Sequence, residues 1–329
     1  MLDDNSTARA MALMIAAMLM LPGIDAIAKW LSGAVSSGQI TWSRFFFQVI
    51  FMSPLLWLTR GPWWTPALPL HAARGALIAL ATLCFFTGLG YLPMADAIAI
   101  FFIEPLLVTL LSALFFGEPI HWRRISAIAL GFIGALIIIR PTFAEVGYAV
   151  LFPVGAATCF SFYILLTRKL VANEDPIRLQ FFAGIFGCLV MGAGLGWGTA
   201  SEVSILTAAW PSNAQWLLLA ALGLIGASCH LLVVYAYRSA SIGILAPFQY
   251  IEIIAATILG LMLFGDFPDA PTWLGIAIIV GSGIYVFRRE ARLAAQDRLE
   301  AISDPTAPDG TLATEPSSDA TRKFGSDPN

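Results

Sequence analysis

The sequence predicts an all-α integral membrane protein with ten transmembrane helices, arranged as two inverted five-helix repeats. Three observations predict this fold: the composition, the number of apolar runs and a similarity between the two halves. Of the 329 residues, 58% are hydrophobic and only 12% are charged, whereas soluble domains carry about 25% charged residues. With a mean hydropathy of +0.80, the chain has too few charges to cover a water-facing surface.

Ten apolar runs are long enough to cross a bilayer, whose core of about 30 Å needs about 20 helical residues. Turn-forming or charged clusters separate the runs, for example Arg60-Gly61-Pro62 and Asn173-Glu174-Asp175-Pro176. Ten spans leave no room for a folded domain outside the membrane. The runs cover residues 10–31, 38–58, 72–91, 94–116, 122–140, 147–167, 178–198, 213–236, 241–264 and 271–288.

The distribution of Lys and Arg predicts the orientation. If residues 1–9 are cytoplasmic, the segments on that side carry 13 Lys or Arg residues and the outer side carries three. Because positive charge accumulates on the cytoplasmic side, we expect both termini there. Residues 290–329 hold eight acids and four bases and few large apolar side chains, a composition that predicts a disordered acidic cytoplasmic tail.

The two halves of the sequence resemble each other. An odd number of helices per copy inserts the second copy upside down, and inverted repeats can open alternately to each side around a site near the midplane. The matching segments are Phe102-Ile103-Glu104 with Tyr250-Ile251-Glu252 and Phe116-Gly117-Glu118 with Phe264-Gly265-Asp266, both at an offset of 148, and Arg44-Phe45-Phe46 with Gln180-Phe181-Phe182 at an offset of 136.

The five-plus-five arrangement, the Gly-Glu or Gly-Asp that closes the fourth and ninth spans, and the run from Trp273 to Gly281 resemble the EamA branch of the drug/metabolite transporter superfamily. The resemblance implies two EamA repeats, 10–140 and 147–289, in a bacterial inner-membrane secondary carrier of a small organic solute. The segments Pro22 to Trp30 and Arg44 to Phe47 are most similar to vitamin- and nucleoside-type importers. Import of a riboflavin-like vitamin is therefore the first expectation. S-adenosylmethionine, amino acids and export are the alternatives.

Polar side chains inside the spans are candidate cavity residues. Placing an ionisable group within a span raises the free energy of membrane insertion by about 2.5–3.5 kcal/mol. Asp25 and Lys29 share one helix face; they either form an ion pair at the outer end of the first span or contact the solute. The full set, with neighbouring aromatic residues, is Asp25, Lys29, Arg44, Phe101, Glu104, Gln180, His230, Phe248, Gln249, Tyr250 and Glu252.

Arg44 and Gln180 occupy equivalent places in the two copies, which indicates that both face the central cavity. The planar guanidinium group suits a carboxylate, a phosphate or a ring edge. The alternative is that Arg44 is a structural partner of Asp25 or Glu104.

Glu104 and Glu252 also occupy equivalent places in the two copies. Either carboxyl group could exchange protons and couple transport to them, or both are structural.

Pro247 should interrupt the ninth helix. Phe248, Gln249 and Tyr250 follow it and could stack on a flat ring and bind its edge. Phe101 is the counterpart of Gln249 in the first copy.

His230 is the one histidine in its span, where it either completes the packing through a hydrogen bond or contacts the solute.

The motifs exclude several functions. The sequence holds no HExxH or GxSxG motif, no His or Cys cluster that would bind a metal and no nucleotide-binding domain. We therefore expect no enzymatic activity, no cofactor, no metal and no nucleic-acid partner. The expected partners are the lipid bilayer and a small-molecule substrate, with the chain a monomer or homodimer. A membrane-embedded enzyme and a receptor are the alternatives of another class.

Overall fold

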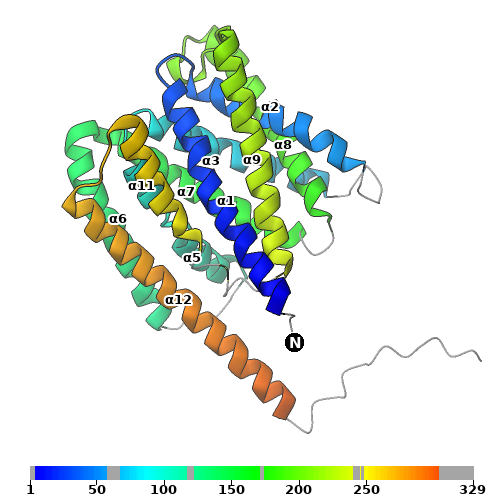
Figure 1. Cartoon of the computed structure of the whole chain (residues 1–329), viewed down its shortest axis with the longest axis vertical. Coiled ribbons are helices and arrows are strands. Elements are labelled where there is room, and N and C mark those ends of the chain that lie inside the picture. Colours follow the sequence, from blue (N-terminus) through cyan, green and yellow to red (C-terminus); the bar gives the residue numbers. More distant parts are fainter. Residues whose placement is uncertain are drawn as a thin grey trace, which may run out of the picture. The chain divides into compact units, whose positions relative to one another are not determined.

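The computed structural model describes residues 4–57, 67–116, 122–170, 174–239, 245 and 248–303, and every regular element in these ranges is a helix (Figure 1). Residues 1–287 form one compact unit and residues 288–329 a second. The helices are α1 Asp4–Leu31, α2 Ser37–Leu56, α3 Leu68–Leu89, α4 Met94–Phe101, α5 Glu104–Phe116, α6 Trp122–Val146, α7 Leu151–Leu170, α8 Pro176–Ala200, α9 Asn213–Ser239, α11 Ile251–Phe264 and α12 Ala270–Ser303, with the short 3₁₀ helices η1 Gly147–Val150 and η2 Ser204–Leu206.

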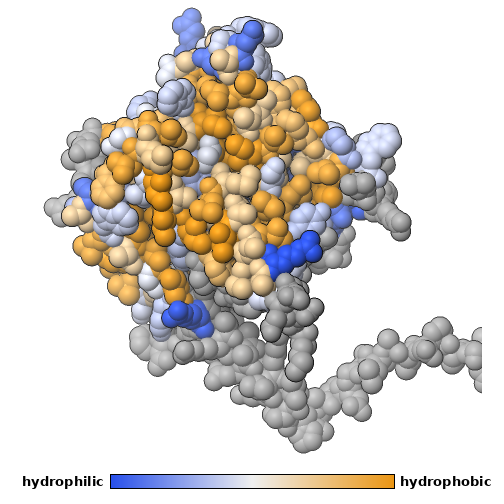
Figure 2. Space-filling view, in the orientation of Figure 1, coloured by the Kyte–Doolittle hydropathy of each residue, from blue (hydrophilic) through white to orange (hydrophobic). Residues whose placement is uncertain are grey.

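Several of these helices can cross a membrane. Apolar side chains cover most of the face shown in Figure 2, as expected of a surface that meets lipid. Three shorter apolar helices cover Ile125–Ile139, Ile251–Phe264 and Ala270–Tyr285. Six helical segments are long and apolar enough to span, namely Thr7–Leu31, Leu68–Leu89, Met94–Phe115, Gly147–Thr167, Pro176–Ala200 and Asn213–Tyr237. The described residues therefore form an all-α, multi-pass membrane protein.

The helices pack across the two halves of the chain. α1 lies along α9, and α3 lies along α7 (Figure 1). α2 packs on both α8 and α9, while α3 also packs on α8. The first helix of each expected repeat therefore packs against the third helix of the other, so neither half encloses a core by itself.

The fourth expected span is broken, which corrects the prediction of one helix over 94–116. α4 ends at Phe101 and α5 begins at Glu104, with a turn at Phe102 and Ile103 between them. Pro105 explains the break, because it has no N–H to donate and its ring clashes with the carbonyl group four residues earlier. Near the end of the chain, α11 begins at Ile251 after a turn at Tyr250. Pro247, expected to interrupt that helix, lies outside the described residues.

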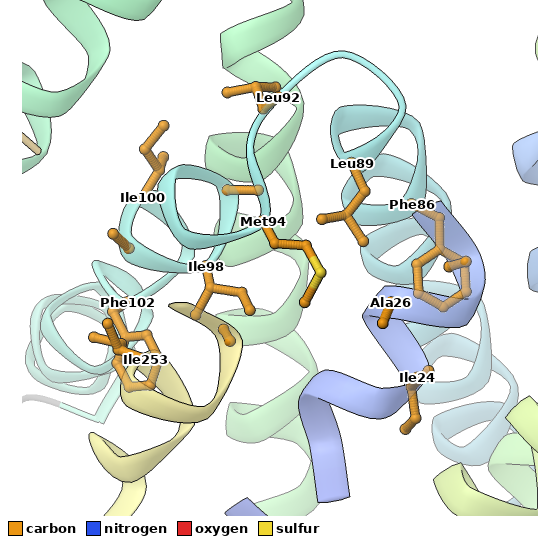
Figure 3. Packing of buried hydrophobic residues seen from close by; sticks show 14 of the residues in the cluster. Ile24, Ala26, Phe86, Leu89, Leu92, Met94, Ile98, Ile100, Phe102 and Ile253 are labelled. Atoms are coloured by element: carbon orange, nitrogen blue, oxygen red, sulfur yellow. The ribbon is translucent and has the colours of Figure 1, made fainter. Parts of the chain in front are cut away.

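A large apolar cluster fills the space between α1, α3, α4 and α11. Ile24 of α1, Phe86 of α3 and Ile98 of α4 are buried in it (Figure 3). Leu89 and Met94 extend it beside the connection between α3 and α4. Close packing of this kind excludes water, so the cluster closes this part of the bundle.

Glycines allow α2 and α8 to approach closely. A Cβ atom at Gly187 would lie 2.9 Å from the ring of Phe45, and one at Gly184 would lie 2.9 Å from a methyl group of Val49. Gly196 lies on the same helix, yet a Cβ atom there would meet nothing within 4 Å. Only some of the small residues in α8 are therefore needed for helix contact.

We expect Gly187→Ala to destabilise the protein and Gly196→Ala to leave its stability unchanged. The added methyl group at Gly187 meets the buried ring of Phe45, and overpacking of this kind costs about 1–3 kcal/mol. Thermal unfolding of both full-length variants in detergent would measure the difference. Equal melting temperatures for the two variants would contradict the close α2–α8 contact.

Candidate functional site

One cavity of about 210 Å³ brings together side chains from both halves of the chain. Its walls come from α1, α2, α3, α7, α9 and α11 and from the break between α4 and α5. Seven of the eleven residues expected at a central site line it: Asp25, Arg44, Phe101, Glu104, His230, Gln249 and Glu252.

Lys29 lies apart from the cavity. Its Nζ atom is 2.5 Å from Oδ2 of Asp266, in the connection between α11 and α12, and donates to the carbonyl oxygen of Leu92 at 2.8 Å. The ammonium group also lies 5.0 Å from the ring centre of Phe264. The expected Asp25–Lys29 ion pair is therefore replaced by one with a residue far away in sequence.

Three further expected residues do not line the cavity. Gln180 is buried on α8, where its backbone carbonyl oxygen accepts a hydrogen bond from the side-chain amide of Gln48 at 2.9 Å. Phe248 packs against a small apolar cluster built from α1 and α9. Tyr250 packs its ring on Phe102, with ring centres 5.4 Å apart. Tertiary packing directs these side chains elsewhere.

Two neutral side chains hold Arg44 in the cavity wall. Nη1 donates to Oγ1 of Thr82, and Nη2 lies 2.9 Å from Nε2 of His230. Because a guanidinium group can only donate, Nε2 of His230 must accept, so its imidazole is neutral with the proton on Nδ1. The sequence also allowed Arg44 to bond to Asp25 or Glu104, but its hydrogen bonds among the described residues go to Thr82 and His230 instead.

Three carboxyl groups share the cavity with this guanidinium group. Asp25, Glu104 and Glu252 all line it, and no hydrogen bond or ion pair to their side chains is found within the described ranges. Glu252 interacts electrostatically with both Asp25 and Glu104, and Asp25 with Arg44. Among the residues that the structure describes, these carboxyl groups included, no three His, Cys, Asp or Glu side chains are grouped so that they could hold a metal ion.

The two glutamates occupy matching places in the fold. Glu104 is the first residue of α5 and Glu252 the second of α11, each directly after a turn. The N-terminal end of a helix carries a partial positive charge. It therefore stabilises a negative charge on either glutamate. The breaks bring these helix ends to the cavity, which two continuous helices would not do.

Aromatic rings form a second wall, hereafter the aromatic wall, built from Phe85, Phe101 and Phe160. The ring centres of Phe85 and Phe101 are 5.3 Å apart, those of Phe101 and Phe160 are 5.5 Å apart, and both pairs are inclined at 64°. Edge-to-face pairs are a favourable ring geometry. Nearby, Nε2 of Gln249 donates to the hydroxyl group of Tyr237 at 2.7 Å.

Sequence reasoning missed Thr82, Phe85 and Phe160, which all line the cavity. Neutral and aromatic residues are common in apolar helices, so nothing in the sequence marks these three. The ionisable residues were found because burying them is costly.

Comparison with known proteins places the chain among transporters. The profile of the EamA-like transporter family matches residues 8–140 and 147–288. An S-adenosylmethionine uptake transporter of Rickettsia conorii is 26% identical over 271 residues, 82% of this chain and 88% of the relative. A riboflavin transporter of Rhizobium johnstonii is 28% identical over 315 residues, 89% of this chain and 98% of the relative. A solved crystal structure with 22% identity and a TM-score of 0.58 covers 87% of this chain and 99% of its own, which shows a shared fold. These matches confirm the family resemblance.

We expect His230→Leu to destabilise the protein more than His230→Gln. Leucine leaves a buried N–H of Arg44 without its acceptor, at a cost of about 1–3 kcal/mol, whereas the glutamine carbonyl oxygen can still accept. Thermal unfolding of the two variants in detergent measures this. If the Leu variant proved as stable as the Gln variant, His230 would not be an acceptor for Arg44.

Proposed function

Because the chain belongs to the EamA-like transporter family, we propose that it is a secondary transporter that carries a small organic metabolite across the bacterial inner membrane by alternating access. The observation that carries the proposal is a cavity within an apolar helical bundle whose lining includes Asp25, Arg44, Glu104, His230 and Glu252. Groups that are expensive to bury gather there, and such groups in a membrane protein mark a solute or ion pathway.

Alternating access rests on two inverted five-helix repeats, 10–140 and 147–289, within ten spans. Two features support this arrangement. α1 packs on α9 as α7 packs on α3, and the turns before Glu104 and Glu252 occur at the same place in each repeat. Transporters with inverted repeats bind their solutes at broken helices near the midplane. An even number of spans would leave both termini in the cytoplasm.

One end of the bundle is closed around Lys29. The bonds from Lys29 to Asp266 and Leu92 tie α1 to two connecting segments. The apolar cluster includes Leu92 beside this ion pair and also Ile24 and Phe86, which line the cavity. By the distribution of Lys and Arg this end faces the cell exterior. Solute entry from that side requires the ion pair and the cluster to separate.

The aromatic wall favours a solute with a flat ring. Riboflavin and S-adenosylmethionine, the substrates named for the two relatives, both carry a flat heteroaromatic ring that can stack on phenylalanine. The cavity of about 210 Å³ is below the roughly 300–1,000 Å³ typical of organic-ligand sites. Its walls therefore move apart when such a solute binds. We propose import as the direction, as for the uptake relative.

Flux into proteoliposomes that contain the full-length protein tests the function. We expect time-dependent uptake of riboflavin or S-adenosylmethionine, and accelerated exchange when the same solute is loaded inside. Protein-free liposomes are the control, and product analysis would reveal an enzyme. If no vitamin, nucleoside or amino acid in a broad panel enters faster than in the control, the transporter proposal fails.

Glu104 and Glu252 are the proposed coupling residues, since their side chains line the cavity without hydrogen-bond partners in the described ranges. Replacing both by glutamine removes the two exchangeable protons. We expect the double variant to lose uptake driven by a pH gradient, while it retains exchange of labelled for unlabelled solute. The control is Asp269→Asn, the same acid-to-amide change in an exposed connection. Unchanged gradient-driven uptake by the double variant would rule out this coupling.

A further inference from the structure

A second cavity lies between α6 and α12, which run side by side (Figure 1). Its volume is about 510 Å³, and its walls come from residues 126–130 of α6 and 277–285 of α12. None of these residues lines the central cavity. Leu130 and Tyr285 in its walls are about half exposed, so the cavity is a groove that opens to the surroundings of the bundle.

Glycines explain how the two helices touch and yet leave this groove. A Cβ atom at Gly275 would lie 2.7 Å from the carbonyl oxygen of Gly134, and one at Gly134 would lie 2.9 Å from that of Gly275. The two backbones therefore meet at this point. Gly281 lies further along α12 in the wall of the groove, and a Cβ atom there would meet nothing within 4 Å. This glycine is not needed for helix contact, and its missing side chain widens the groove instead.

The groove lies at the depth of the bilayer core. Its walls belong to the apolar segments Ile125–Ile139 and Ala270–Tyr285, and their surface in the groove is mostly apolar. The hydroxyl group of Ser282 already donates to the carbonyl oxygen of Ile279 at 2.9 Å. Water is unfavourable in an apolar space, and atoms that line an empty space lose their van der Waals contacts. A hydrocarbon chain from the surrounding lipid satisfies both conditions.

Positive charge lies at one end of the groove. The first turn of α6 contains Arg123 and Arg124. Arg123 precedes Ser126 and Ala127 in the groove wall by three and four positions, and residues at this spacing share one face of a helix. With both termini in the cytoplasm, as proposed above, this end of α6 lies at the cytoplasmic surface. Basic pockets between transmembrane helices on that side bind anionic lipid headgroups.

We propose that the groove between α6 and α12 binds one anionic phospholipid of the cytoplasmic leaflet, with an acyl chain against Gly281 and the phosphate group at Arg123 and Arg124. Tyr285 lies where the sequence leaves the apolar segment, a depth at which tyrosine side chains meet lipid headgroups. This lipid is not the transported solute, because the groove and the central cavity share no lining residue. The proposal rests on the proposed orientation of the chain and not on the identity of its solute.

Native mass spectrometry of the full-length protein in detergent tests the proposal. The probes are phosphatidylglycerol and phosphatidylcholine with identical acyl chains, which differ in the net charge of the headgroup. We expect one phosphatidylglycerol molecule bound per chain, with an affinity at least about tenfold higher than that of phosphatidylcholine, because each arginine near the membrane surface favours an anionic headgroup.

Two variants separate the acyl-chain site from the headgroup site. Gly281→Leu fills the groove and should weaken binding of both lipids at least about tenfold. Its matched control is Gly196→Leu on α8, at another exposed position where a Cβ atom meets nothing within 4 Å, and it should bind both lipids as the unsubstituted protein does. Replacing Arg123 and Arg124 by glutamine should remove the preference for phosphatidylglycerol while binding of phosphatidylcholine persists.

Three outcomes would overturn the proposal. The first is equal affinity of the unsubstituted protein for the two lipids. The second is undiminished binding of phosphatidylglycerol by Gly281→Leu. The third is a lipid-free dimer that Gly281→Leu, but not Gly196→Leu, converts to a monomer, since a second copy of the chain would then occupy the groove.

Discussion

The cost of placing charge within an apolar bundle determines how this molecule is organised. Several of the cationic side chains that the structure buries or half-buries have specific partners. Arg74 is 1% exposed and donates to Thr167, Tyr163 and the carbonyl oxygen of Leu179. Lys29 is bound by Asp266 and by the carbonyl oxygen of Leu92. Against these satisfied groups, the carboxyl groups in the central cavity stand out, because they lack such partners in the described ranges. The contrast distinguishes polar groups that hold the bundle together from those available to a solute.

The broken helices make this cavity possible. In a continuous helix each backbone group is bonded internally and only side chains reach a neighbouring space. The turn at Phe102 and Ile103 and the turn at Tyr250 instead bring helix ends to the cavity, and Glu104 and Glu252 lie in the first turns that follow. Their negative charge is favoured there by the helix dipole. The break at Phe102 and Ile103 divides the fourth expected span into two shorter helices, α4 and α5.

The side chains that line the cavity differ in ways that bear on selectivity. Arg44 is held by neutral partners and retains its full charge, while Asp25 and the two glutamates provide acceptors. The aromatic wall supplies a surface without charge between elements of both halves. A solute that matches only the wall gains stacking energy but leaves the buried charges without partners, and such mismatches are the strongest source of discrimination in binding sites.

The class of protein, the approximate helices and the ionisable residues of the cavity could be predicted from the amino-acid sequence, because length, apolar content and charges inside apolar runs are visible along the chain. The break in the fourth span was not predicted, because the apolar run over 94–116 indicated one continuous helix and the effect of Pro105 was recognised only in the structure. Which polar residues meet was decided only by the tertiary structure. Lys29 pairs with Asp266 across 237 positions rather than with nearby Asp25, and Arg44 bonds to Thr82 and His230 rather than to a carboxylate. These partners lie on different elements of the fold, and their distances depend on how the helices cross, which no local pattern specifies.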